Sequence, residues 1–171
     1  TRLDSGEYAY LIICDYNKGL LNYPFIQMIC KRCNDLKIKV LVDTKRKEVD
    51  CFAGSYLATP NYIEFRSSIG FTLSNFKSIL ITEGEKGMML CTGNTFHQRI
   101  SPYKVNCVDV CGAGDTVIAA IATALQKSYP IYDACIFANL AAIIVVQKYG
   151  TAVVTKEELD KEYLRGTHKI Y

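Results

Sequence analysis

Two apolar segments, each ending at an aspartate, restrict the fold of this chain most. The apolar run Tyr8–Cys14 closes on Asp15, and Ile38–Val42 repeats the pattern before Asp43. Such runs predict strands buried on both faces, as in a parallel sheet that helices cover. Between them, Tyr23–Leu36 has apolar residues at helical spacing. The three segments predict a β-α-β unit, a motif that places ligand-binding groups at the carboxyl ends of its strands.

The same alternation continues along the rest of the chain. Strands are expected at residues 55–59, 78–82, 87–91, 95–100 and 152–154, and helices at residues 114–126, 131–148 and 156–165. Gly150 is expected to end the second of these helices, because helices often end at a glycine. This order predicts an α/β fold, a three-layer α/β/α sandwich with a mostly parallel sheet, in a single domain over residues 1–171.

Length and composition agree with an ordered globular protein. The chain has 171 residues, of which 50% are hydrophobic and 22% charged, so it can bury a core of its own. Its longest apolar run, residues 134–146, is shorter than the roughly 20 residues that span a bilayer. The start of the chain has no signal-peptide pattern. We therefore expect no membrane residence.

Charge and cysteine usage restrict the partners and the compartment. The net charge of +3 is dispersed, and the dense basic cluster Lys45–Lys47 is typical of a solvated face, so no nucleic-acid partner is expected. Most of the eight cysteines lie in apolar runs, as free thiols do in the reducing cytoplasm. Cys30 and Cys33 have metal-type spacing, but no second pair of ligands accompanies them, so neither zinc nor a protein cage for another metal is expected.

The segment Asp109–Thr116 has the composition of an anion-binding loop. Its small residues Gly112, Ala113 and Gly114 precede a predicted helix, whose first N–H groups are unpaired and attract an anion. No Gly-Lys-Ser/Thr follows, so the loop is not a Walker motif. From the residues alone, Asp115 is either a helix N-cap or a general base.

Three motifs between residues 61 and 120 resemble those of the PfkB (ribokinase) family of carbohydrate kinases. Residues 109–120 resemble its Asp-Thr-x-Gly-Ala-Gly-Asp signature, Thr82-Glu83-Gly84 its Thr-x-Gly nucleotide turn, and Asn61 with Glu64 its Asn-x-x-Glu motif for magnesium and phosphate. The resemblance implies a ribokinase-like fold and a cytoplasmic enzyme. It also implies transfer of the γ-phosphoryl group of ATP, with Mg²⁺, to a sugar hydroxyl.

Within the family, the chain resembles the bacterial heptose 7-phosphate kinases of ADP-heptose synthesis. Residues 15–19 resemble their Asp-Tyr-x-Lys-Gly segment, residues 42–45 their Val-Asp-Pro-Lys segment, and residues 138–152 their penultimate helix and turn. The resemblance covers about Tyr8 to Leu159. It implies a heptose 7-phosphate acceptor. It also implies that the N-terminal region, with the β-sheet lid and most sugar contacts, precedes this C-terminal nucleotide-binding and catalytic part.

The resemblance also implies roles for individual residues. Asp115 is the expected catalytic base, beside an anion hole formed by the backbone of Cys111, Gly112, Ala113 and Gly114. Nucleotide contacts are expected from Thr82, Gly84, Asn139, Gly150 and Thr151. Asn61, Glu64 and Asp109 are expected near phosphate and Mg²⁺, and Lys18 and Lys45 near a phosphate of ATP or of the sugar.

The loop at residues 109–115 differs from the family pattern, and alternatives stay open for the roles of several residues and for the function of the chain. Cys111 stands where threonine is usual, so this position has no hydroxyl. Asn61 also fits a turn, Lys18 and Lys45 fit a solvated surface, and Asn139 fits a buried core amide. One alternative function is a truncated or degenerate kinase fragment that binds only nucleotide or a separate lid-bearing chain. The other is a kinase of this family for another sugar or for a nucleoside. A homo-oligomer is open.

Overall fold

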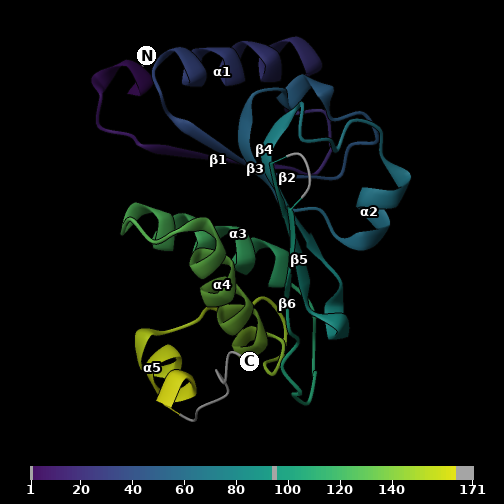
Figure 1. Cartoon of the computed structure of the whole chain (residues 1–171), viewed down its shortest axis with the longest axis vertical. Helices are drawn as coiled ribbons and strands as arrows, with labels where there is room; N and C mark the ends of the chain where they lie inside the picture. Colours follow the sequence, from purple (N-terminus) through teal and green to yellow (C-terminus); the bar gives the residue numbers. More distant parts are fainter. Residues whose placement is uncertain (1, 94–95, 165–171) are drawn as a thin grey trace.

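The computed structural model describes residues 2–93 and 96–164, and a six-stranded sheet forms its centre (Figure 1). The strands, adjacent in chain order, are β1 (Tyr10–Asp15), β2 (Lys39–Thr44), β3 (Ser55–Ala58), β4 (Phe76–Thr82), β5 (Met88–Thr92) and β6 (Phe96–Ile100). Strands β1 to β4 are parallel, whereas β5 and β6 are each antiparallel to their predecessor. Thr95, the first residue of the strand predicted at residues 95–100, lies outside the described residues.

Helices lie on both faces of this sheet, as predicted. The helices are α1 (Tyr23–Asp35), α2 (Tyr62–Ser67), α3 (Ala113–Gln126), α4 (Ile131–Val145) and α5 (Lys156–Leu164), with short 3-10 turns η1 (Arg2–Ser5), η2 (Asp50–Phe52) and η3 (Gly84–Lys86). In Figure 1, α1 and α2 lie on one side of the sheet and α3 and α4 on the other, while α5 packs on α4. The architecture is the predicted α/β sandwich with a mostly parallel sheet.

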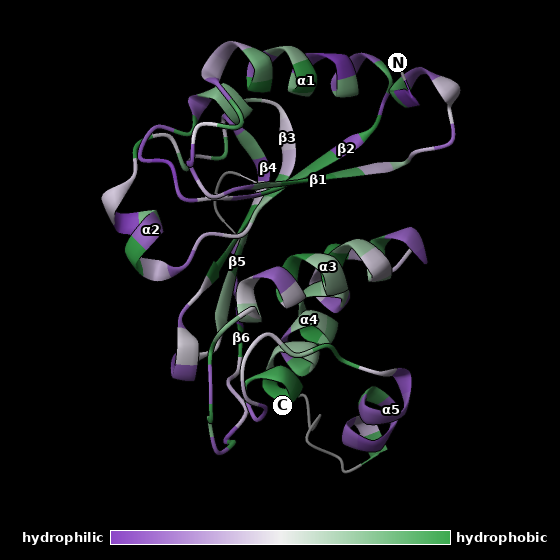
Figure 2. Cartoon of the chain, turned by 180° about the vertical axis from the view of Figure 1, so that it is seen from behind, coloured by the Kyte–Doolittle hydropathy of each residue, from purple (hydrophilic) through white to green (hydrophobic). Residues whose placement is uncertain are grey.

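The alternation of side chains along the inner strands fills two separate cores. On β2, Val40 and Val42 point into the core beneath α1, and Leu41 points into the core beneath α3 and α4. On β4, Ile79 and Leu80 divide in the same way. Figure 2 shows apolar segments on both the sheet and the helices that cover it. Each fully buried side chain of this size contributes roughly 1.5–3 kcal/mol, so the two faces together hold the strand ends in place.

The first strand departs from the prediction of burial on both faces. Ile13 is buried, with 8% of its surface exposed, but Ile12 is 39% exposed and Cys14 is also exposed. The reason is topological, because β1 is an edge strand, and although α3 contacts it, the helix leaves the side of Ile12 partly open. The apolar run predicted the strand correctly but not its position in the sheet.

Helix α4 ends earlier than predicted. It stops at Val145, with Val146 as its C-cap, instead of continuing to Lys148. Gly150 has the left-handed φ of +67° but belongs to the turn beyond the helix, so its predicted role as the helix-ending glycine was wrong. Within the described ranges, no helix combines the length and apolar character that a bilayer span requires.

The predicted strand at residues 152–154 is absent. Val154 instead packs against an apolar cluster on α4 that includes Leu140, Ile143 and Ile144. Helix packing therefore partly buries Val154 without a sheet ladder, whereas Val153 is 77% exposed. Helix α5 follows as predicted and ends at Leu164, and Arg165 lies outside the described residues.

Candidate active site

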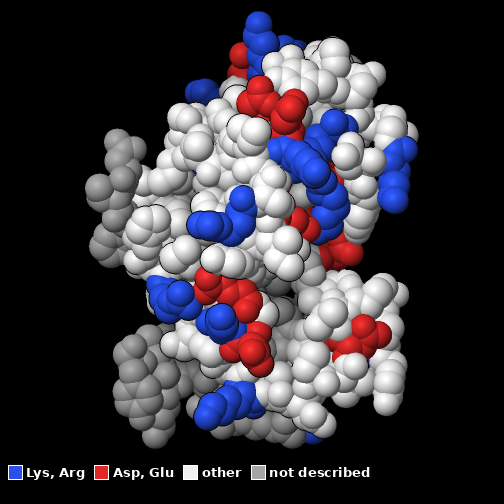
Figure 3. All heavy atoms as spheres, turned by 90° about the vertical axis from the view of Figure 1, so that its right-hand side faces the viewer, with Lys and Arg blue, Asp and Glu red and all other residues white. Residues whose placement is uncertain are grey.

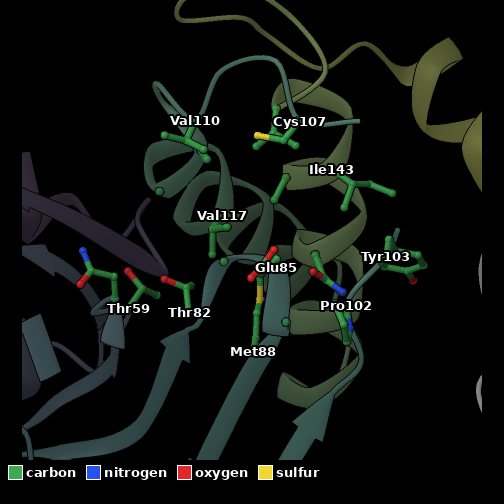
Figure 4. A pocket seen from close by; sticks show the side chains of 18 of the residues that line it. Thr59, Thr82, Glu85, Met88, Pro102, Tyr103, Cys107, Val110, Val117 and Ile143 are labelled. Atoms are coloured by element: carbon green, nitrogen blue, oxygen red, sulfur yellow. The ribbon is translucent and has the colours of Figure 1, made fainter. Parts of the chain in front are cut away.

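An open pocket of about 550 Å³ lies between the carboxyl ends of the central parallel strands and helices α3 and α4. In Figure 4, Thr59 directly follows β3 and Thr82 ends β4, while Val117 and Ile143 come from α3 and α4. The residues predicted for the site that line this pocket are Lys45, Asn61, Glu64, Thr82, Gly84, Ala113, Gly114 and Asn139. The fold thus brings segments that are far apart in the sequence to one cavity.

One end of the pocket is apolar. Its wall is formed by Met88, Pro102, Tyr103, Val105, Cys107, Val110, Ile143 and Val146. Figure 4 shows Cys107 and Val110 across the pocket from Met88. Most of this wall comes from the irregular segment between β6 and α3, and its wall residues Pro102, Tyr103, Val105, Cys107 and Val110 were not predicted as site residues. Ligand pockets commonly combine such an apolar wall with a few polar groups, which here lie at the other end.

Asp109 shapes the loop before α3 through its carboxylate. Its Oδ1 accepts a hydrogen bond from the backbone N–H of Cys111, and its Oδ2 accepts one from the N–H of Gly150, both at 2.9 Å. These bonds, that from Cys111 foremost, lower the pKa of Asp109. Asp109 therefore joins the loop to the turn after α4. Asp109 was predicted to lie near phosphate and Mg²⁺, but both of its carboxylate oxygens accept hydrogen bonds from the backbone.

The turn after α4 lies against the same loop. Gly112 has φ +75°, and a Cβ added there would lie 3.5 Å from the Thr151 side chain. The predicted nucleotide residues Gly150 and Thr151 therefore contact the loop and do not line the pocket.

The loop presents some of the predicted anion-hole N–H groups and uses others. The N–H of Cys111 donates to Asp109, and that of Ala113 donates to the carbonyl of Val110 at 3.2 Å. In the described part of the chain, the N–H groups of Gly112 and Gly114 have no such partner. The free donors are thus at the two glycines, where no side chain blocks an approaching anion.

Asp115 lies exposed in the first turn of α3 and contacts a residue from the other end of the chain. Gly112, and not Asp115, is the N-cap of this helix, so the simple capping interpretation of Asp115 does not apply. The hydroxyl of Tyr16 donates to the Asp115 carboxylate, at 2.8 Å from Oδ1 and 3.0 Å from Oδ2. This bond is the main cause that raises the pKa of Tyr16 to about 12.

A row of alternating charges lies at the polar end of the pocket. The Nζ atom of Lys45 lies 2.6 Å from Oε1 of Glu64 and 3.6 Å from Oδ1 of Asp43. Burial raises the pKa of Asp43, which is only 7% exposed. Burial alone would lower the pKa of Lys45, but the bond to Glu64 and the charge of Asp43 outweigh it, so the net shift is upward. Lys45 is therefore held as a cation facing the pocket.

Asp43 is a pocket residue that the sequence analysis did not include among the site residues. It lies near the end of β2, and a Cβ added at Gly114 would lie 3.7 Å from its Oδ2. The available signal was its position as the aspartate that ends an apolar strand.

Asn61 and Glu64 begin a short helix, α2, that was not predicted. The Asn61 side chain accepts from the N–H of Glu64, and the Glu64 side chain accepts from the N–H of Asn61, both at 2.9 Å. This reciprocal pair is a capping box, whose Asn-x-x-Glu spacing could have predicted the helix. The pair therefore has a structural role besides any role toward a ligand.

The remaining predicted residues divide between pocket and surface. Asn139 is 4% exposed, lines the pocket, and donates from Nδ2 to the carbonyl of Ser101 at 3.0 Å. It is thus both a satisfied buried amide and a pocket residue. Thr82 ends β4, and Gly84 begins η3 beside it. Lys18 lies exposed in the loop after β1 and is not part of the pocket wall.

Two of the three residues in the basic cluster Lys45–Lys47 form ion pairs with carboxylates. Lys45 pairs with Glu64, and the guanidinium of Arg46 pairs with the buried carboxylate of Asp15. Figure 3 shows acidic and basic side chains interspersed on the face that includes α2. The charges of the cluster are therefore largely compensated.

Solved kinase structures share this fold at low sequence identity. Phosphofructokinase-2 from Escherichia coli in complex with potassium has a TM-score of 0.81 and 16% identity, over 96% of this chain and 59% of that chain. Ribokinase from Thermotoga maritima has a TM-score of 0.71 and 22% identity, over 90% of this chain and 56% of that chain. These likenesses establish that the fold is ribokinase-like.

Sequence relatives identify the family. The bifunctional protein HldE of Haemophilus ducreyi is 36% identical over 170 residues, covering 90% of this chain and 35% of that protein. HldE of Shewanella baltica is 37% identical over 172 residues, covering 92% of this chain and 35% of that protein. The chain therefore spans about a third of the length of these relatives. The sequence profile of the pfkB family carbohydrate kinases matches residues 42–158, more than half of the chain. The chain belongs to the pfkB family of carbohydrate kinases.

Proposed function

We propose that this chain is the nucleotide-binding and catalytic part of an ATP-dependent sugar kinase whose acceptor is heptose 7-phosphate. The observation that supports this most directly is the start of α3. There Asp115 directly follows the loop whose N–H groups at Gly112 and Gly114 are free, and Gly114, though not Asp115 itself, lines a pocket with one apolar and one polar end. A base, an anion-binding backbone and a nucleotide-sized cavity are the components that phosphoryl transfer requires.

In the proposed mechanism, the nucleotide base occupies the apolar end of the pocket and the triphosphate extends toward α3. Lys45, held as a cation, neutralises part of the phosphate charge. Asp115 accepts the proton of the acceptor hydroxyl. At the same time the acceptor oxygen attacks the γ-phosphorus, and the bond from that phosphorus to the leaving ADP oxygen breaks. The N–H groups of Gly112 and Gly114 stabilise charge on the transferring group, helped by the positive end of α3.

The residues at the polar end fit a magnesium ion bound through water. Asp43, Asn61 and Glu64 line the pocket with oxygen atoms, the ligand type that Mg²⁺ prefers. Both Glu64 oxygens already accept bonds, from Lys45 and from the Asn61 N–H, which favours contact through water over direct ligation. When bound, the ion would neutralise phosphate charge. Asn61 and Glu64 would orient its water ligands, and Asp109 would act indirectly by shaping the loop.

We propose further that residues 1–171 form a single domain and that the sugar is held largely by other parts of the protein. The chain spans 35% of the HldE relatives, and the family resemblance implies an upstream lid region. That lid is either joined to this chain or supplied by a separate one. Lys18 is exposed near the end of β1 and is available to a sugar phosphate placed there. A cytoplasmic location agrees with its free cysteines.

The assignment is tested by measuring ATP consumption with heptose 7-phosphate, ribose and fructose as acceptors. Each is assayed with this chain alone and with the chain joined to the upstream lid region of an HldE relative. We expect phosphorylation of heptose 7-phosphate, at least in the joined form. Preference for ribose or fructose would replace the acceptor and keep the kinase. No phosphoryl transfer in either form would contradict the proposed function and favour a fragment that binds only nucleotide or a partner.

A further inference from the structure

Tyr16 is an exposed aromatic residue with one specific polar contact. It follows β1 directly, is 52% exposed, and reaches the Asp115 carboxylate, from which it is separated by 99 positions in the sequence. Because the Tyr16 ring is largely exposed, its burial contributes little to stability, and the hydrogen bond of its hydroxyl is the more informative feature. The proposed mechanism above does not use this residue.

The loop that contains Tyr16 is anchored on both sides. The buried Asp15 carboxylate accepts from the N–H of Asn17 at 3.0 Å and pairs with Arg46. The same guanidinium also donates to the carbonyl of Leu21, at the far end of the loop. Asn17 has the left-handed φ of +53°, which turns the backbone sharply after Tyr16. These contacts fix the backbone of the loop and so restrict where the Tyr16 ring can lie. The hydroxyl of Tyr16 therefore faces α3 from an anchored loop.

The bond to Asp115 constrains the carboxylate without filling it. Its two distances, 2.8 and 3.0 Å, place the hydroxyl oxygen nearly equally far from the two carboxylate oxygens. An ionised carboxylate offers about four acceptor positions, and a single phenol proton takes only part of this capacity. A second donor, such as a sugar hydroxyl, can therefore still bind Asp115 while Tyr16 limits rotation of the carboxylate.

We propose that Tyr16 is a positioning residue for phosphoryl transfer, whose hydroxyl holds the Asp115 carboxylate in the orientation that accepts the acceptor proton. This role rests on the proposed function of Asp115 as the base. Tyr16 keeps its own proton throughout, and the transferred proton moves only from the acceptor hydroxyl to Asp115. The raised pKa of Tyr16, about 12, agrees with a phenol that stays protonated at neutral pH.

The kinetic test compares Tyr16→Phe with Tyr23→Phe in the form of the protein that phosphorylates heptose 7-phosphate. Tyr23 is a matched control, because its hydroxyl donates to Oδ2 of Asp50 at 2.7 Å, between α1 and η2 and away from the pocket. We expect Tyr16→Phe to lower kcat by roughly tenfold or more with little change in either KM, since one hydrogen bond that orients the base is lost. Tyr23→Phe should leave both parameters unchanged.

The possible results separate this role from the proposed function. Wild-type kcat in Tyr16→Phe, with Asp115→Asn inactive, would overturn the positioning role and leave the kinase assignment intact. A change confined to the KM of the sugar would make Tyr16 a binding contact and also overturn the role. Full activity in Asp115→Asn, or none in any form, would remove the proposed function and this role together.

A second measurement tests the contact itself without turnover. In this chain labelled with carbon-13 at the tyrosine Cζ, the Tyr16 signal should titrate near pH 12, and in Asp115→Asn it should return toward about 10, the ordinary tyrosine value. An unchanged titration in Asp115→Asn would show that the two groups are not in contact and would overturn the proposal.

Discussion

Gly87 provides the sharpest test of the backbone geometry beside the pocket. It lies between η3 and β5, with φ +87° and ψ −139°, a conformation that residues other than glycine rarely adopt. A Cβ added there would lie 2.3 Å from the carbonyl oxygen of Ile100 and 2.9 Å from the nitrogen of Pro102. Both are backbone atoms, so neither can rotate away as a side chain would. Gly87→Ala should therefore require the β5 and β6 ends to separate.

The expected cost follows from these two effects. The unfavourable backbone conformation costs about 1–3 kcal/mol, and overpacking against rigid neighbours costs about 1–3 kcal/mol more. A total of about 4 kcal/mol is a large fraction of the roughly 5–15 kcal/mol by which such domains are stable. Gly84 is the matched control in the same turn, because it has φ +57° but no atom within 4 Å of an added Cβ. Gly84→Ala should cost only about 1–2 kcal/mol.

The assay is urea unfolding of the wild type and both variants, followed by circular dichroism. The dependence of the free energy of unfolding on urea concentration should be similar in all three proteins. The free energies of unfolding themselves should differ by about 2–3 kcal/mol between the two variants. Equal stability of Gly87→Ala and Gly84→Ala would refute the inferred contact with the end of β6. It would also refute the shape of this pocket wall.

Two further predictions concern stability. Asn61→Ala should lower the free energy of unfolding by about 1 kcal/mol because it removes the α2 cap, whereas Asn61→Asp should retain it; equal losses in urea unfolding would contradict the capping role. Burial raises the pKa of Cys135 from 9.0 to about 12. Its stabilising contribution is therefore complete below about pH 9 and is lost as the pH rises toward 12, by at most about 1.4 kcal/mol per pH unit. Urea unfolding from pH 8 to 11 should show a shallower decline in Cys135→Ala, and an unchanged slope would count against this cause.

Local patterns predicted most of the regular elements because each pattern has a local physical cause. The runs before Asp15 and Asp43 became parallel strands, and the small residues before Asp115 became the start of α3. Patterns failed where burial depends on distant segments. Ile12 is partly exposed because β1 lies at the sheet edge, and Val154 found its apolar environment on α4 and not in a strand.

The candidate site shows the same division. The resemblance identified Lys45, Asn61 and Thr82, and the fold brings them to one pocket. The capping box of α2 was readable from the sequence, but Asn61 and Glu64 were interpreted as a ligand motif, with a turn as the alternative for Asn61. The contact between Tyr16 and Asp115 had no local signal, since it joins the loop after β1 to the first turn of α3 through the tertiary arrangement.

The central claim, that Asp115 is the base of a sugar kinase, is tested most directly by Asp115→Asn. The amide retains the shape of the side chain but cannot take a proton from the acceptor hydroxyl. Steady-state phosphorylation of heptose 7-phosphate and equilibrium ATP binding are measured in the active form of the protein. We expect retained ATP binding with turnover lowered by at least roughly a hundredfold, the usual scale for a general base. Near-normal turnover in Asp115→Asn would contradict the central claim.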